Sequence, residues 1–342
     1  MNWFLLWFDG KTGRVRSGWR AAIYLVALNV AGFLVMFGIS MPLAQAFHLD
    51  ITKFFKTPVG SSTMDLTSIL ITYLTMIAAN VAAAVVLLRN LDHLPSHTLG
   101  LGLDGRRLLA LVGGFAGTLV LIFLLVALCV GTGFAHVQVN VVTPIMLQHL
   151  SLALGALLIV AMATELMYRG YLFQTLLRGI GMPITLLLMA CFIAIPPDKN
   201  ATPLVITNLA LEGVLFGLLY LRAGHLWLSI GASAGWKLGL LLCHLRISGT
   251  EIPIATPLLA TLTGHPLLTG GDYGPEGGAV VSALLLLLIA AVAYAPIGLP
   301  LTSRWWEWPD LTTPAARLPA WDFTVDNRAY QWKLLPREPG ES

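Results

Sequence analysis

The chain has 342 residues, of which 57% are hydrophobic and only 11% are charged. A soluble globular protein carries roughly 25% charged residues, so the composition excludes a soluble protein and indicates a polytopic integral membrane protein. The formal net charge of +3 is small and no basic stripe is present, which excludes a nucleic-acid-binding function.

Eight apolar runs are candidates for membrane-spanning helices, because about 20 apolar residues are needed to cross roughly 30 Å of hydrocarbon. The fifth run is the shortest and ends at Pro196-Pro197, where the missing amide donors stop a helix. The sequence therefore predicts an all-α helix bundle with about eight transmembrane helices. The candidate runs lie at about 21–43, 66–88, 108–131, 143–168, 182–196, 203–221, 225–245 and 278–301.

The distribution of positive charge predicts the orientation of these helices. If the N-terminus is cytoplasmic, most of the 20 Lys and Arg residues lie inside, as the positive-inside rule requires. The basic segment 1–20 precedes an apolar run that is too long for a signal peptide, so we predict a retained anchor. We expect both termini in the cytoplasm and the protein in a bacterial cytoplasmic (inner) membrane. The basic residues that would lie outside are Lys53, Lys56, Lys199 and Arg246.

The predicted helices and the charge distribution divide the chain into three regions. Residues 1–20 form a cytoplasmic or interfacial N-terminal segment, residues 21–301 form the transmembrane domain, and residues 302–342 form a cytoplasmic tail. Trp305, Trp306 and Trp308 open the tail. Because indole rings prefer the headgroup layer, we expect part of the tail to lie on the membrane surface.

Four charged side chains lie in the predicted helices or at their ends: Glu165, Arg169, Glu212 and Lys237. His149 and His244 also lie in or near the predicted helices. Charged groups inside a bilayer cost a few kcal/mol each, so each of them is a functional candidate. Glu165 and Arg169 are four residues apart and share one helix face, where they can pair. The pair either holds a carboxylate next to a water-accessible site or anchors the end of a helix.

Several segments together resemble the CPBP family, the CAAX-protease and bacteriocin-processing intramembrane endopeptidases. The stretch 163–172, ATELMYRGYL, resembles the first family motif, Glu-Glu-x-x-x-Arg followed by Gly. Further similarity lies in 99–103 (LGLGL), 217–222 (GLLYLR) and the glycine-rich loop 267–277. The resemblance extends over about 90–280 and implies the fold of these membrane proteases.

The resemblance also implies a catalytic site that this sequence largely lacks. In the family, the first glutamate of the motif activates a water molecule, and histidines from Phe-x-x-x-His and His-x-x-x-Asn motifs help to hold it. Here the first glutamate is replaced by Thr164, and the two histidine positions hold Pro196 and Ser233. Lys237 stands at the asparagine position. Peptide hydrolysis needs a base near the attacking water and donors for the developing charge.

Only Glu165 and Arg169 of the motif residues remain. Losing one group of a catalytic unit commonly costs orders of magnitude in rate, so we expect a proteolytically inactive member that acts as a scaffold or subunit of a membrane complex. One alternative is an active endopeptidase with a modified site that uses Glu165 and Arg169. Another is a transporter-like protein, although inverted repeats and paired broken helices are absent from the sequence.

Ser233 and Lys237 leave two interpretations open. They lie four residues apart on one helix face, so a lysine base could activate a serine nucleophile. Alternatively, Lys237 pairs with Glu212 or Glu165 and neutralises a buried charge.

The three cysteines have no Cys-x-x-Cys spacing and the histidines lie far from Glu165 along their helices, so we expect no metal. No cofactor is indicated. We expect contacts with membrane lipids and a membrane-protein partner.

Overall fold

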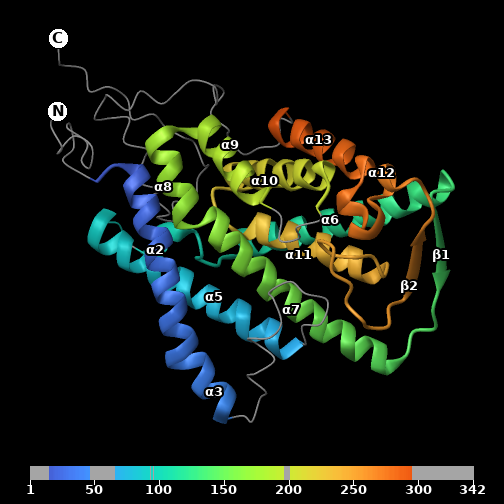
Figure 1. Cartoon of the computed structure of the whole chain (residues 1–342), viewed down its shortest axis with the longest axis horizontal. Helices are drawn as coiled ribbons and strands as arrows, with labels where there is room; N and C mark the ends of the chain where they lie inside the picture. Colours follow the sequence, from blue (N-terminus) through green and yellow to red (C-terminus); the bar gives the residue numbers. More distant parts are fainter. Residues whose placement is uncertain (1–14, 47–65, 93, 95, 196–200, 295–342) are drawn as a thin grey trace.

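The computed structural model describes residues 15–46, 66–92, 94, 96–195 and 201–294. Of this part, 78% is helical, so the predicted all-α membrane bundle is confirmed as a fold class (Figure 1). The N-terminal segment before residue 15, the tail 302–342 and Pro196 lie outside the described residues, and the expectations for them stay predictions.

Two long helices near the N-terminus pack side by side (Figure 1). Helix α2 (Ser17–Val35) continues through a π-helical turn into α3 (Met41–Ala46), and it packs against α5 (Leu66–Leu87). The buried hydroxyl of Tyr24 donates a hydrogen bond to Asn80 Oδ1 at 2.7 Å. In an apolar bundle such a bond removes the cost of burying both polar groups.

The remaining helices begin and end at signals that are visible in the sequence. Three of them start after a Thr or Asp side chain that accepts a hydrogen bond from a backbone amide of the first turn, which is the usual N-cap arrangement. The break between α7 and α8 falls at Gly170, where an added Cβ would lie 2.2 Å from the carbonyl oxygen of Leu166. The helices are α6 (Gly105–Gly131), α7 (Pro144–Arg169), α8 (Tyr171–Ile180), α9 (Met182–Ile193), α10 (Pro203–Ala223), α11 (Trp227–Leu242), α12 (Pro266–Thr269) and α13 (Ala279–Tyr294).

A short two-stranded sheet closes one end of the bundle, which we call the sheet end. Strands β1 (Ala135–Val139) and β2 (Leu258–Leu262) pair antiparallel, with Ala135 opposite Leu262. Three short turns follow: α12, η4 (Gly271–Tyr273) and η5 (Pro275–Gly277). The sequence analysis did not predict these strands.

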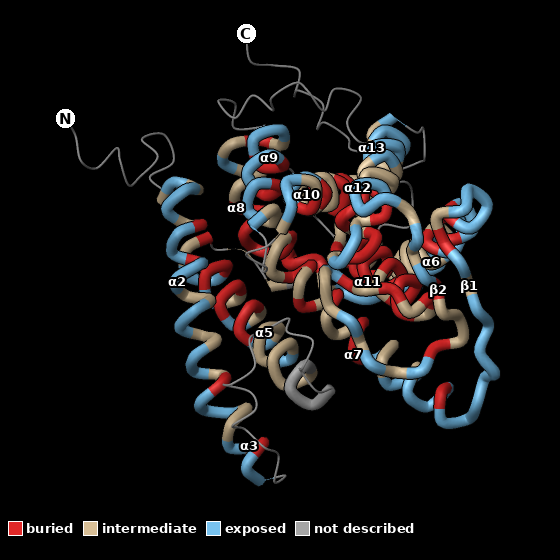
Figure 2. The backbone as a smooth tube through the Cα atoms, turned by 45° about the vertical axis from the view of Figure 1, so that its right-hand side comes forward, coloured by how far each residue is buried: buried red, intermediate tan, exposed pale blue. Residues whose placement is uncertain are grey.

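Helix α11 lies at the centre of the described structure and is buried along nearly its whole length (Figure 2). It packs closely on α6 because glycines replace larger side chains at the contact. A Cβ at Gly231 would lie 2.0 Å from the carbonyl oxygen of Leu111, and one at Gly235 would lie 2.1 Å from that of Phe115. Small residues allow helix backbones to approach in this way in membranes.

The predicted spans all coincide with helices, but their lengths differ. Five helical segments of the described part are long and apolar enough to cross a membrane, among them α6 and α10. The fifth candidate, 182–196, is α9, whose 12 residues cover only about 18 Å at the rise of an α-helix. The count of eight spans therefore stays a prediction, as does the orientation.

Candidate functional site

The ionisable residues of the predicted spans gather where α7, α10 and α11 meet. Glu165 and Arg169 lie on α7 and are buried, with 2% and 3% of their surface exposed. Arg169 Nη1 donates a hydrogen bond to Glu165 Oε1 at 3.1 Å. The pairing predicted from their spacing is thus confirmed.

Arg169 also ties α7 to α10. Its Nη2 donates to the carbonyl oxygen of Gly213 at 3.2 Å. The guanidinium carbon lies 5.6 Å from the ring centroid of Tyr168 and 5.5 Å from that of Phe216. Both distances are within the range of cation–π attraction. The arginine is therefore held on several sides, and it fixes the position of Glu165.

The other oxygen of Glu165, Oε2, is buried and has no hydrogen-bond partner in the structure. Glu165 also interacts electrostatically with Lys237 of α11 and with Glu212 of α10. The three helices thus bring the Glu165–Arg169 pair of α7 together with Glu212 and Lys237, which lie far from it in the sequence.

Lys237 does not form the predicted ion pair. Its Nζ donates a hydrogen bond to Ser233 Oγ at 2.7 Å, one helical turn away. Within the described residues, no carboxylate lies within ion-pairing distance of this amine. The expected direct pair with Glu212 or Glu165 is therefore wrong.

The geometry also bears on the serine–lysine alternative. The hydrogen bond places a possible base next to a possible nucleophile, as the spacing predicted. However, Ser233 is only 2% exposed and lies within the packed face of α11. A substrate carbonyl would need space beside this hydroxyl, and the burial of Ser233 disfavours such access.

Thr164, which stands for the first glutamate of the motif, has its hydroxyl engaged within its own helix. Its Oγ1 donates to the carbonyl oxygens of Val160 and Ala161, at 3.0 and 3.1 Å. Back-bonding of this kind is common for threonine in helices. No group of three or more His, Cys, Asp or Glu side chains gathers at metal-binding distance within the described part of the chain.

Two functional candidates were missed by the sequence analysis: Trp236 and Glu276. Trp236 Nε1 donates to Glu276 Oε1 at 2.7 Å, and the backbone N–H of Ser248 donates to Glu276 Oε2. Asn208 of α10 holds the same loop by donating to the carbonyl oxygen of Glu276 at 2.8 Å. An acidic residue between glycines and a proline was the only available signal in the sequence.

Glu276 lies in η5, beyond the helical spans, and its environment favours the protonated acid. Burial raises the pKa of Glu276 above its ordinary value, and the nearby charge of Glu212 raises it further. The N–H groups of Ser248 and Trp236, and the charge of Lys237, act in the opposite direction. The raised pKa shows that burial and like charge prevail.

A protein-family model matches the central helices of the chain. Residues 146–239 match the family model described as Type II CAAX prenyl endopeptidase Rce1-like. The match begins in α7 and ends in α11, so it includes Glu165, Arg169, Ser233 and Lys237. It confirms the resemblance to CAAX proteases that the motif at 163–172 indicated. No curated protein and no solved structure matches the chain significantly.

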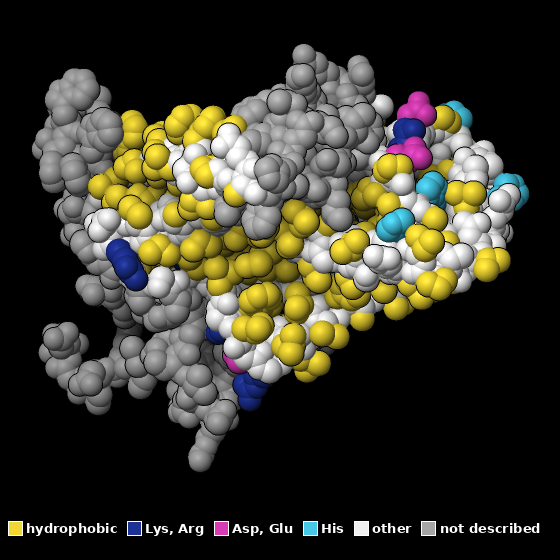
Figure 3. All heavy atoms as spheres, turned by 90° about the horizontal axis from the view of Figure 1, so that it is seen from below, with side chains coloured by type: hydrophobic (Ala, Val, Ile, Leu, Met, Phe, Trp, Pro, Cys, Tyr) yellow, Lys and Arg dark blue, Asp and Glu magenta, His cyan; other side chains and the backbone are white. Residues whose placement is uncertain are grey.

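The apolar surface agrees with a CAAX-protease-like membrane protein. Figure 3 shows hydrophobic side chains over most of the described surface in that view, with charged side chains and histidines at its margins. Large apolar residues such as Leu109 and Leu124, exposed by 71% and 63%, lie on α6. In a soluble monomer such a continuous apolar surface would be unusual, whereas lipid accounts for it here.

Proposed function

We propose that this chain keeps the fold of the CAAX-type intramembrane proteases without their proteolysis, and that it serves as a scaffold or subunit of a complex in a bacterial cytoplasmic membrane. The proposal joins the family resemblance to the loss of the residues that would activate a water molecule. It includes a membrane-protein partner, because an inactive member acts through what it binds.

One observation carries the proposal. At the substituted motif positions that the structure describes, the polar groups bond within their own helices: Thr164 to the backbone of α7, and Lys237 to Ser233. In a working site these positions would face a shared water molecule from different helices. Glu165, the remaining carboxylate, is paired with Arg169.

A cleavage assay tests the absence of proteolysis. The full-length protein, reconstituted in liposomes, is incubated with a farnesylated CaaX peptide, alongside Glu165→Gln and an active CAAX protease. We expect the wild type to release no more product than Glu165→Gln, while the active protease cleaves the peptide. Turnover by the wild type that disappears in Glu165→Gln would overturn the proposal and favour the modified-site endopeptidase.

Isolation from native membranes tests the scaffold role. After mild crosslinking and solubilisation, the tagged chain should co-purify with one membrane protein in a fixed ratio. If the chain migrates alone, at its own mass plus detergent, in both crosslinked and untreated samples, the scaffold role is wrong. This outcome is independent of the cleavage assay.

A further inference from the structure

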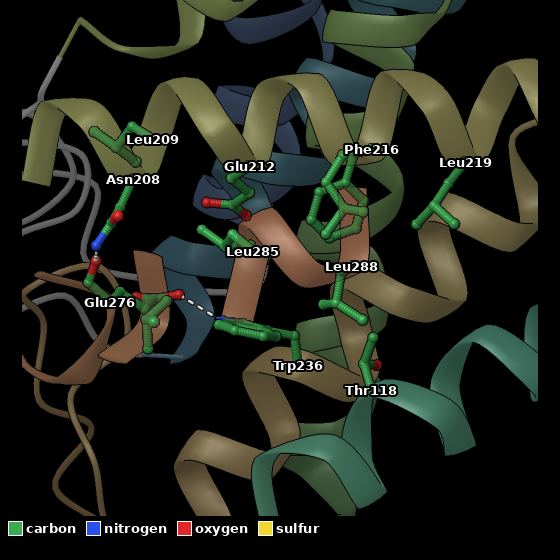
Figure 4. Close-up of a pocket in the computed structure, with 12 residues that line it drawn as sticks. Thr118, Asn208, Leu209, Glu212, Phe216, Leu219, Trp236, Glu276, Leu285 and Leu288 are labelled. Atoms are coloured by element: carbon green, nitrogen blue, oxygen red, sulfur yellow. Dashed lines mark hydrogen bonds between the residues drawn. The ribbon is translucent and has the colours of Figure 1, made fainter. Parts of the chain in front are cut away.

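A small cavity lies between α10, α11, α13 and η5 (Figure 4). Its wall is mostly apolar, with leucines and Phe216 along one side. Two carboxylates line it, Glu212 from α10 and Glu276 from η5, together with the indole of Trp236. The free space admits about two water molecules. The cavity is thus a small, mostly apolar space with two acidic groups in its wall.

The two carboxylates differ in their hydrogen bonds. Both oxygens of Glu276 accept from N–H groups, one from Trp236 and the other from Ser248. Among the described residues, the carboxylate of Glu212 has neither a hydrogen bond nor an ion pair. Figure 4 shows its side chain projecting from α10 toward the cavity. Glu212 is partly exposed, and it is the carboxylate of the cavity without a protein partner among the described residues.

The surrounding charges do not balance. The acidic groups that interact here are Glu165, Glu212 and Glu276, and the basic groups are Arg169 and Lys237. With all five ionised, one negative charge remains in excess. The walls contributed by α6 and α13 bring no acidic or basic side chain to the cavity. Tyr168, which also interacts with Glu212, is neutral as a phenol.

Such an excess charge is costly in the interior of a membrane protein. An uncompensated ion in a low-dielectric region costs several kcal/mol, and two carboxylates that share a site do not both stay ionised. The simplest species that removes the excess is a proton.

We propose that Glu212 and Glu276 together bind one exchangeable proton at neutral pH, through the cavity between α10, α11 and η5. The proton cancels the excess charge and leaves Glu276 able to hold Trp236 and Ser248. When both carboxylates are ionised, their repulsion acts on Glu276, which fastens the loop of the sheet end to α11 through Trp236. The bound proton therefore stabilises the docked loop, and the docking weakens at alkaline pH.

Infrared spectroscopy of the full-length protein in lipid nanodiscs tests the proposal. A protonated carboxylic acid has a C=O stretch that is separate from the carboxylate bands and shifts in D2O. We expect this band in the wild type at pH 7 and its loss as the pH is raised. We also expect its loss in Glu276→Gln. In Glu212→Gln the band should disappear at a lower pH than in the wild type, because Glu276 stays buried but no longer faces a like charge. The control Glu251→Gln, at an exposed site near the same loop, should keep the band.

Two results would overturn the inference. One is the absence of the protonated-acid band from the wild type at pH 7. The other is a band that persists in Glu276→Gln, which would place the proton on another group such as Glu165, or a band whose pH dependence in Glu212→Gln equals that of the wild type. Glu212 has no bond to lose among the described residues, so Glu212→Gln should fold. Near-ultraviolet circular dichroism verifies this.

Discussion

Single hydrogen bonds within one helical turn decide how the buried charges of this protein are arranged. The pairing of Glu165 with Arg169 was predictable, because residues four apart on a helix are neighbours whatever the helix packs against. For Lys237 the sequence left two partners open, Ser233 or a carboxylate, and the structure shows Ser233. The rise per residue places Lys237 at the depth of Glu212, but it does not give the direction in which either side chain points.

His225 gives a pH prediction at the scale of one residue. It lies in the turn between α10 and α11, where burial lowers its pKa to about 4, with Arg107 acting in the same direction and Asp104 against it. The unfolded chain, with an ordinary value near 6.5, binds this proton more readily. The folded state should therefore lose stability as the pH falls from about 6.5 to 4, by roughly 1–2 kcal/mol after allowance for solvent screening.

The measurement is the unfolding midpoint in mild detergent between pH 7 and pH 4, compared between wild type and His225→Gln. Glutamine cannot take up the proton, so its midpoint should change less over this range. Parallel curves for the two proteins would show that His225 stays neutral in both the folded and the unfolded state, or charges equally in both, contrary to the expectation.

At the scale of elements, the packing of α6 on α11 is the closest helix contact described. The hydroxyl of Thr118 on α6 donates to the carbonyl oxygen of Ala232 on α11 at 2.8 Å, which links the α6 side chain to the α11 backbone. The glycines of both helices were visible in the sequence. Their positions alone did not show which helices they join, because several spans contain small residues.

Gly235→Ala should weaken this contact. The new Cβ would lie 2.1 Å from a backbone oxygen of Phe115, and backbone atoms cannot yield as a flexible side chain does. We expect a loss of about 1–3 kcal/mol, as for other overpacked cores. Gly113→Ala on α6 is the matched control, since its Cβ would meet nothing within 4 Å and alanine favours helix. Equal unfolding midpoints for the two variants in a detergent titration would contradict this account.

At the scale of the whole molecule, the arrangement in the membrane rests on charge distribution. Arg106 and Glu251 are both exposed and lie toward opposite ends in the predicted topology. If the positive-inside rule holds, Arg106 lies in the cytoplasm and Glu251 outside. The loops of the sheet end would then lie on the outer face of the membrane, together with Glu276.

Cysteine labelling measures this orientation. Single cysteines at Arg106→Cys and Glu251→Cys are placed in a chain whose three native cysteines have been replaced. In intact cells a membrane-impermeant maleimide should label the cysteine at position 251, and it should label that at position 106 only after permeabilisation. The reverse pattern would invert the topology and would place the proposed proton site toward the cytoplasm.

The sequence by itself determined the membrane location, the helical fold class, the order of the helices and the family resemblance. These follow from composition, apolar run length and short motifs, which are local properties of the chain. The tertiary structure decided which ionisable groups meet: Glu276 from a glycine-rich loop beside Glu212, and Lys237 with Ser233 rather than with a carboxylate. Side-chain direction around each helix and the folding back of the 270–278 loop create these contacts, and both depend on packing between segments distant in the sequence.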